Sequence, residues 1–383
     1  MTDIRGIITK IETINTIIRE GKGHIDHPED LVFLEDEHGA RRAIDSMVAT
    51  VENPQLITLK YDGYPALIFG RGPDGKFSIM DKHMFNKKDG TGRQVFSPQE
   101  FAQYDLNRGV DRGDLHAIIA NLWQGLEKDD RAGNGYYWGD LLFSHPLVDH
   151  AGVYKFKANP NGIEYAVDVK SDVGKLLSGK DAAIAVHQFI PADAVSTDQA
   201  VSLDGTLGNL QNASNIAIVP SKMPIVPKLK INSNLKKIAE QTLSQYGNSV
   251  HELMHNAPQT RKTFNQLFTV FVNKKIVSGS LTNLARDFMD FVEARPMSDS
   301  MKAKIAEHLN NNKQGIIGAF KIWAALYNLK MDVVSQLNTA VESSPIRGYL
   351  ADGKQSQEGF VSQGLKFVDR LGFSRQSLSA NRL

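Results

Sequence analysis

Hydrophobic and polar positions change their spacing twice along the chain, and each change marks a predicted domain boundary. Residues 1–50 carry apolar side chains at helical spacing, which predicts helices over 1–20 and 40–51 on either side of a polar turn. Residues 51–231 alternate short apolar runs with Gly, Pro, Asp and Asn, as is typical of strands and turns. Residues 232–383 return to helical spacing. The pattern predicts an N-terminal helical segment, a sheet-rich core and a C-terminal all-helical domain.

Individual elements follow from the same spacing. In the middle region, a helix is expected over 115–126 and strands over 67–70, 77–80, 136–142, 163–169, 182–189 and 217–219. In the C-terminal region, helices are expected over 234–245, 260–276, 281–293, 300–310, 314–341 and 357–371. The stretch 193–214 is rich in Ser, Thr, Asn and Gly, and this composition predicts a surface loop. The expected fold class is α+β, with an antiparallel sheet in the core.

The composition is that of an ordinary globular protein, with 383 residues, 41% of them hydrophobic and 23% charged. No apolar run is long enough to cross a bilayer, and the N-terminus lacks the apolar core of a secretory signal. We therefore expect a cytoplasmic protein without a membrane partner. The absence of cysteine excludes disulfides and thiolate metal sites. Because the net charge is only +1, a nucleic-acid partner would need a local basic patch.

The most informative stretch is Lys60-Tyr61-Asp62-Gly63, which stands between two apolar runs. This pattern predicts a strand that ends at Lys60, a tight turn at Gly63 and a second strand that returns beside the first. A lysine held in this way, partly desolvated and near other cations, can lose its proton and become an amine nucleophile. Without that chemistry, the same residues would form a hairpin with an exposed Lys and Asp.

Lys-x-Asp-Gly resembles motif I of the covalent nucleotidyltransferases, a superfamily of ATP-dependent DNA and RNA ligases and mRNA capping enzymes. The resemblance implies that Lys60 attacks the α-phosphate of a nucleotide and carries the nucleoside monophosphate as a phosphoramidate. It also implies that Gly63 belongs to the nucleotide site, and that Asp62 orients the lysine or binds a metal ion.

Three further segments resemble later motifs of this superfamily and follow in the same order. The aromatic run ending in Asp140 resembles motif III, whose carboxylate binds ribose or metal. The next segment resembles motif IV, where Glu164 is the favoured metal ligand and Asp168, on the same face of the strand, is the alternative. Lys228 and Lys230 resemble motif V, in which two lysines on one strand face grip the α-phosphate. Each segment also fits a plain amphipathic or basic edge strand.

The match is incomplete at motif I. Ligases normally have Arg two residues after the Gly, where this chain has Pro65, so Arg71 or Arg93 would have to contact the ribose. Lys82 would approach the nucleotide or the nucleic-acid end. The sequence Lys-x-Asp-Gly-x-Pro-Ala looks like a divergent group encoded by large tailed phages, which would place the protein in the host cytoplasm. Two flanking elements share that likeness, His27-Pro28-Glu29-Asp30 upstream and Phe85-Asn86-Lys87 downstream.

A different motif, His-Glu-x-x-His, lies at His251–His255. On a helix, both histidines fall on one face and could bind zinc, with Glu252 as a general base. Pro258 predicts that the helix carrying the motif is short. A zinc hydrolase is therefore one alternative function, and a polar helix face without metal is the other interpretation of this segment.

The resemblance as a whole predicts an ATP-dependent polynucleotide ligase that uses Mg²⁺ or Mn²⁺. Lys60 would take AMP from ATP, the AMP would pass to a 5′-phosphate, and a 3′-hydroxyl would displace it. DNA ligases and capping enzymes normally append an OB-type barrel, whereas RNA ligases often append helices. Because the pattern after Lys230 is helical, RNA is expected over DNA as the partner. A binding protein that has lost catalysis remains an alternative, because the motif I Arg is missing.

Overall fold

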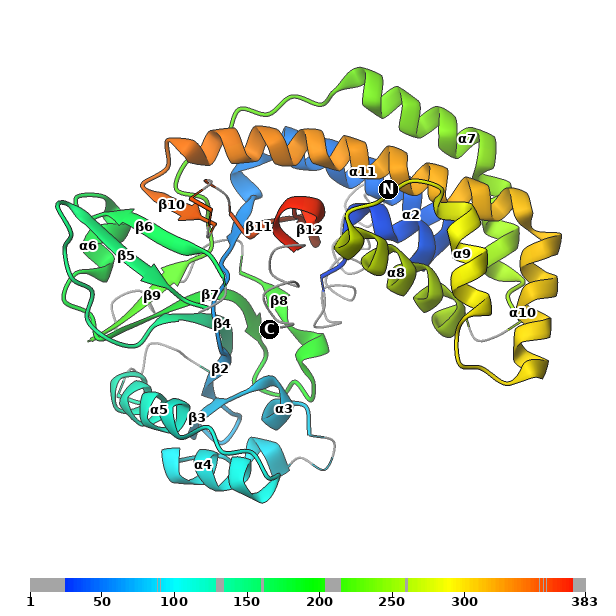
Figure 1. Ribbon diagram of the computed structural model, residues 1–383. Helices are drawn as coiled ribbons and strands as arrows, with labels where there is room; N and C mark the ends of the chain where they lie inside the picture. Colours follow the sequence, from blue (N-terminus) through cyan, green and yellow to red (C-terminus); the bar gives the residue numbers. More distant parts are fainter. Residues whose placement is uncertain are drawn as a thin grey trace, which may run out of the picture. The chain divides into compact units, whose positions relative to one another are not determined.

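The computed structural model describes residues 25–87, 89, 91–128, 134–159, 162–203, 215–258, 261–350, 352–353, 355 and 357–374. Its fold is mixed α+β, and the chain forms two compact units (Figure 1). Unit 1 comprises Met1–Ile25, Leu56–Val226 and Val341–Glu358, and unit 2 comprises Asp26–Gln55, Pro227–Ala340 and Gly359–Leu383. Both units are therefore discontinuous in sequence, unlike the three consecutive domains expected. The helix expected over 1–20 lies outside the described residues.

A six-stranded sheet with the strand order β3-β2-β4-β7-β8, and with β9 also beside β7, forms the centre of unit 1. Its strands are β2 (Ala66–Arg71), β3 (Phe77–Met80), β4 (Gly135–Phe143), β7 (Ala182–Ile190), β8 (Val201–Ser202) and β9 (Ile216–Pro220). Five of them confirm predicted strands, and β8 lies in the region expected to be a loop. All neighbours are antiparallel except β7 and β9, which run parallel, so the prediction of an antiparallel sheet is only partly right.

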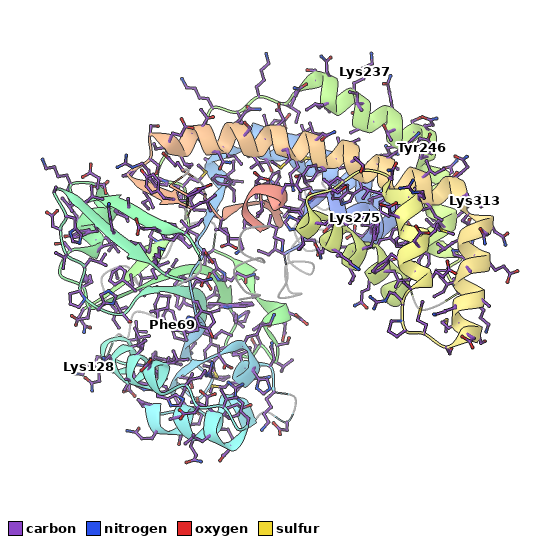
Figure 2. The ribbon with its side chains drawn as sticks, in the orientation of Figure 1. Phe69, Lys128, Lys237, Tyr246, Lys275 and Lys313 are labelled. Carbon is purple, nitrogen blue, oxygen red and sulfur yellow. The ribbon has the colours of Figure 1, made fainter. Side chains whose placement is uncertain are left out.

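Helices α4 (Pro98–Asn107) and α5 (Gly113–Leu126) lie together beside β3 (Figure 1). Phe69 of β2, labelled in Figure 2, belongs to the same apolar core as Phe101 of α4 and Trp123 of α5. The periodicity predicted α5 correctly. It missed α4, whose ten residues include few apolar side chains, and the one-turn helix α3 (Lys82–Phe85).

A second sheet in unit 1 has the order β10-β6-β5 and consists of β5 (Val153–Lys157), β6 (Glu164–Asp168) and β10 (Ile346–Tyr349). The short helix α6 (Asp172–Leu177) follows β6. Side chains alternate between the two faces of this sheet. Tyr165 is fully buried and stacks on Phe156, whereas Glu164 lies on the opposite face.

Unit 2 consists mainly of helices: α2 (Leu31–Glu52), α7 (Ser233–His255), α8 (Arg261–Ser278), α9 (Leu284–Glu293), α10 (Asp299–Asn311) and α11 (Lys313–Glu342). The helical spacing predicted most of them, with α2 beginning earlier than expected. The largest difference is α7, which continues to His255 instead of ending near 245. The expectation of a short helix around the His-Glu-x-x-His motif is therefore wrong, because Pro258 falls after the helix and does not limit its start.

The helices of unit 2 pack through large aromatic side chains. Phe268 of α8 stacks on Phe33 of α2 and on Phe288 of α9, and all three are fully buried. Tyr246 of α7, labelled in Figure 2, accepts a hydrogen bond of 2.7 Å from Lys321 of α11. These contacts confirm that the apolar residues of the C-terminal region form a helical core.

Charged side chains are also buried in unit 2, at the turn that precedes α2. The Glu29 carboxylate accepts hydrogen bonds from Lys330 at 2.7 Å and Arg370 at 3.0 Å. Asp30 accepts from Trp323 at 2.9 Å and from Arg370 at 2.8 Å. Buried charges require such pairing. The acidic residues of the His-Pro-Glu-Asp element therefore form ion pairs and hydrogen bonds in the interior of this unit.

The C-terminal region was predicted to be all helical, and this prediction is wrong. Instead of a helix over 357–371, β11 (Gly359–Ser362) and β12 (Leu365–Phe367) form an antiparallel hairpin. Short apolar runs do not distinguish a strand from a buried helix, which explains the error. No helix in the described ranges is both long enough and apolar enough to cross a membrane.

Candidate functional site

Lys60 ends the short strand β1 (Thr58–Lys60), which is held by backbone contacts within unit 1. The Leu59 amide donates a hydrogen bond to the Ser221 carbonyl, and Thr58 pairs with Lys222 in an antiparallel bridge. Residues directly opposite in such a pair share a face, as do residues two apart in a strand. Lys222 therefore lies on the same face as Lys60.

The chain after Lys60 does not return beside β1, so the predicted hairpin is wrong. The Tyr64 amide donates to the Leu141 carbonyl, and the Leu141 amide donates to the Pro65 carbonyl, each at 3.1 Å. This pairing carries the chain directly into β2, where Ala66 lies opposite Asp140 of β4. The Lys60 segment is thereby placed next to Asp140.

Gly63 allows this close approach. A Cβ atom added at Gly63 would lie 2.5 Å from the Asp140 Cβ and 2.9 Å from the Leu141 carbonyl oxygen. We expect Gly63→Ala to destabilise the protein by about 1–3 kcal/mol, because the turn must move away from β4. Urea denaturation measures this change. Gly113→Ala is the matched control, since its Cβ would have only Asp111 nearby, at 3.8 Å. Equal stability of the two variants would contradict the prediction.

Asp62 fixes the turn that follows the lysine. Its carboxylate accepts hydrogen bonds from the Asn159 side chain at 3.2 Å and the Ile163 amide at 3.1 Å. Its own amide donates to the Tyr165 hydroxyl at 2.7 Å. Because both carboxylate oxygens accept hydrogen bonds from protein groups, the geometry favours the positioning role for Asp62 over metal binding.

The Lys60 ammonium lies among carboxylates and forms an ion pair with Glu358. Burial lowers the pKa of Lys60, but Glu358, Asp140 and Asp62 together outweigh burial and raise that pKa above its usual value. Carboxylates therefore dominate the charge around Lys60, and the lowered pKa that neighbouring cations would produce is not seen in this state. In this state Lys60 is protonated, and it needs the surrounding negative charge to be reduced before it can act as a nucleophile.

Asp140 is the second carboxylate of the site. Its side chain is 19% exposed, and burial together with the neighbouring carboxylates raises its pKa to about 7 despite the attraction of Lys60. His187 Nε2 lies 3.7 Å from the Asp140 carboxylate. Burial, reinforced by Lys60, lowers the pKa of His187 to about 4, so the imidazole is neutral near pH 7.

A β-bulge aims His187 into this site. Trp138 and Gly139 of β4 are consecutive, but their partners in β7 are Gln188 and Val186, which leaves His187 as the extra residue. Bulges often re-aim side chains beside active sites. The His187 ring lies 5.6 Å from the Trp138 ring, and Lys82 of α3 lies 5.4 Å from the Trp138 ring centre. The predicted nucleotide-site residue Lys82 thus joins the same group.

Other predicted residues do not lie with Lys60. Arg71 is at the opposite end of β2, roughly 17 Å along the strand from Ala66, and donates to the carbonyls of Gly75 and Glu127. Arg93 donates to the Phe85 and Val195 carbonyls. Neither arginine is therefore placed to replace the missing motif I Arg.

The predicted metal ligands Glu164 and Asp168 lie on one face of β6, as their spacing required. Tyr165, on the other face, is the residue that reaches Asp62. Glu164 instead lines a cavity of about 410 Å³ with Lys155, Lys157 and Arg347. The structure therefore separates both predicted ligands from the Lys60 group.

Lys228 and Lys230 lie beyond the boundary of unit 1, in unit 2. Both side chains are exposed, and the Lys230 backbone exchanges hydrogen bonds with the Gln336 side chain. Within unit 1, Lys222 is a lysine that sequence reasoning missed, although it lies on the face of Lys60.

Sequence reasoning also missed Glu358 and His187. Glu358 is 298 residues from Lys60 and lies in a segment expected to be helical, so no local pattern connects them. His187 stands inside an apolar strand, where only the bulge reveals its orientation. The one available signal for His187 was a polar residue within an apolar run of the sequence.

The donor set fits a magnesium ion that is bound mainly through a nucleotide. Mg²⁺ commonly uses one or two protein carboxylates together with water and substrate phosphates. Asp140 and Glu358 are two such carboxylates beside Lys60. Two buried donors also make no hydrogen bond within the described residues, the Tyr61 hydroxyl and the Trp138 indole nitrogen. Unpaired buried donors require an explanation, and a bound ligand is one.

Comparison with protein families identifies the chain as a member of a family of unknown function, DUF6267, whose model matches residues 22–382. No curated protein matches the chain significantly. A search of solved structures likewise found no significant match.

Proposed function

We propose that the protein is a covalent nucleotidyltransferase that takes AMP from ATP onto Lys60 and uses it to join polynucleotide ends. The observation that carries this proposal is the position of the Lys60 amine between the carboxylates of Asp140 and Glu358. An amine nucleophile, a nearby proton acceptor and carboxylates for a nucleotide-bound cation are the groups that the reaction requires. The motif I and motif III resemblances, which supply Lys60, Asp62 and Asp140, add support, whereas the segments that resemble motifs IV and V do not lie with Lys60 in unit 1.

In the first step, the Lys60 nitrogen attacks the α-phosphorus of ATP. The new P–N bond replaces the bond to the β-phosphate oxygen, and pyrophosphate leaves. Two protons leave the Lys60 ammonium in this step: one passes to solvent before the attack, and the one released as the P–N bond forms passes to Asp140, since a pKa of about 7 suits a base that acts near neutral pH. Neutral His187 lies beside Asp140 and can donate one hydrogen bond to it. Glu358 would hold Mg²⁺ together with the phosphates, and the bound ion would supply neutralising charge while Asp140 remains the base.

Lys82 and Lys222 are the cations that this proposal assigns to the phosphates. Lys82 is exposed above the Trp138 ring, and Lys222 is exposed on the face of Lys60. They take the role that the resemblance to motif V implied for Lys228 and Lys230, which belong to unit 2.

In the second part of the reaction, AMP passes from Lys60 to a 5′-phosphate end, and a 3′-hydroxyl then displaces AMP. RNA is proposed over DNA because the region that follows the core sequence is mainly helical. A candidate surface for the strand is the outer face of the β10-β6-β5 sheet, where Lys155, Lys157 and Arg347 line one cavity. Such a local cluster of cations can bind a phosphate backbone even though the net charge of the whole chain is only +1.

The direct test is incubation with α-labelled ATP and Mg²⁺, followed by denaturing electrophoresis. We expect label on the protein, lost on mild acid treatment as a P–N bond requires, and transferred when 5′-phosphorylated RNA is added. The same assay with DNA distinguishes the two substrates. Absence of label with ATP, GTP and NAD would reject the proposal and leave a binding protein as the better account.

The basic sheet face gives a separate prediction about binding. We expect Lys157→Ala to weaken binding of single-stranded RNA and to reduce the slope of log K against log salt by about 0.7, because one phosphate contact is lost. Fluorescence anisotropy at several salt concentrations measures this slope. Lys175→Ala removes an exposed lysine of α6 in the same unit and serves as the control. An unchanged slope in Lys157→Ala would place the nucleic acid elsewhere.

A further inference from the structure

Helix α2 in unit 2 contains an abrupt break at Asp36, where the backbone adopts φ 56° and ψ −139°. This conformation is rare for a residue other than glycine, and surrounding structure must enforce it. The Asp36 side chain is only 2% exposed. One of its oxygens, Oδ1, accepts a hydrogen bond of 3.1 Å from the His38 amide. The break thus presents a buried carboxylate in a fixed orientation.

Helix α7 of the same unit brings a histidine to this carboxylate. His251 Nδ1 lies 3.3 Å from Asp36 Oδ2, and this nitrogen is buried and makes no hydrogen bond within the described part of the chain. The His38 ring lies edge-on to the His251 ring, with centroids 6.2 Å apart. One ligand atom from each of Asp36, His38 and His251 lies within 4.8 Å of the other two.

We propose that Asp36, His38 and His251 form a binding site for Zn²⁺ that joins the break in α2 to α7. A carboxylate and two imidazoles are ordinary zinc ligands, and a water molecule would complete a tetrahedral set. Ligand atoms about 2.0–2.1 Å from a zinc ion are roughly 3.4 Å apart. Asp36 Oδ2 and His251 Nδ1 are already 3.3 Å apart, so the exposed His38 side chain is the ligand that must move closer when zinc binds.

This site differs from the one that the His-Glu-x-x-His motif suggests. The rings of His251 and His255 are stacked, with centroids 5.0 Å apart and planes inclined by only 17°. Each imidazole binds a metal in the plane of its own ring, and stacked parallel rings direct their lone pairs along separate planes. His251 therefore pairs with residues of α2 instead of with His255, and the motif does not form a zinc-protease centre here.

The test is zinc binding to the full chain, by equilibrium dialysis against Zn²⁺ and elemental analysis. We expect one zinc ion per chain in the wild-type protein. His38→Gln and His251→Gln should each weaken binding by at least about 100-fold, since loss of a ligand exceeds the 10–100-fold effect of removing an outer partner. His255→Gln is the matched control and should bind zinc as the wild type does.

His38→Gln is the decisive variant because its side chain is 75% exposed and its loss cannot disturb the core. Replacing zinc by Co²⁺ gives a second readout, since visible absorption bands of the bound cobalt should disappear in this variant. Absence of stoichiometric zinc in the wild type would overturn the proposal. So would a site that survives His38→Gln but is lost in His255→Gln, because that result would assign the metal to the histidine pair of α7.

Discussion

Lys60→Ala is expected to eliminate covalent labelling by α-labelled ATP, with a loss of at least about 10³-fold that reaches the background of the assay. No other side chain in the described part of unit 1 combines an amine, burial and two flanking carboxylates in the way that Lys60 does. Removing the nucleophile therefore removes the step and leaves no alternative acceptor. Labelling followed by electrophoresis, with sealing of 5′-phosphorylated RNA as a second readout, measures both parts of the reaction.

Lys60→Arg is the informative control for this experiment. Arginine retains a positive charge and can pair with Glu358, but it stays protonated and cannot form the P–N bond. We expect a folded protein without label, which separates loss of chemistry from loss of structure. If Lys60→Ala sealed ends at the wild-type rate, or if Lys60→Arg accepted label, the assignment of Lys60 as the nucleophile would be wrong.

Asp140→Asn should have opposite effects on activity and on stability. We expect labelling to fall by about 10²–10⁴-fold, the usual contribution of a general base. Without divalent cations at pH 8, the variant should be more stable than the wild type, by on the order of 2–4 kcal/mol. The reason is that the fold forces a carboxylate with a pKa of about 7 to ionise next to Glu358 and Asp62.

The sign of the pH dependence follows from proton binding. Between the usual Asp pKa of 3.8 and the folded value of about 7, the folded state holds a proton that the unfolded state has released. This contribution to the free energy of unfolding therefore falls as the pH rises through that range, and its full cost is present above pH 7. The advantage of Asp140→Asn should grow from pH 4 to pH 7.

Urea denaturation in EDTA at several pH values measures this dependence. Asp168→Asn removes an exposed carboxylate of the same unit and should change the stability by no more than about 0.5 kcal/mol. If Asp140→Asn were less stable than the wild type at pH 8, the Asp140 carboxylate would be a stabilising partner of Lys60, and its role as a base would lose support.

The sequence predicted the elements whose patterns are long or regular. The runs that became β4 and β7 are apolar over most of their length, and α11 keeps helical spacing over 30 residues. The hairpin of β11 and β12 was missed because its strands have only four and three residues and the turn at Gln363 and Gly364 separates them. Strand β10 was also missed, because it is stabilised by pairing with β6, which lies far away in sequence.

Only part of the candidate site could be predicted, for a related reason. Lys60, Asp62 and Asp140 occur in local patterns that resemble known motifs, and the structure brings them together. Glu358 and His187 carry no such pattern, because one depends on a distant segment and the other on a bulge. Glu164 was predicted to lie at the site but does not. Strand alternation placed Glu164 and Asp168 on one face of β6, but it could not predict which face of β6 would point toward the Lys60 segment.

The division of unit 1 into separated segments affects when the site forms during synthesis. Lys60, Asp140 and His187 leave the ribosome early, whereas Glu358 follows only after the helices of residues 227–340 have been made. A nascent chain can thus assemble the large sheet while Lys60 still lacks the carboxylate that forms its ion pair. The Lys60 group is completed only when Glu358 has been translated, 298 residues after Lys60, so its electrostatic state during synthesis depends on a distant segment.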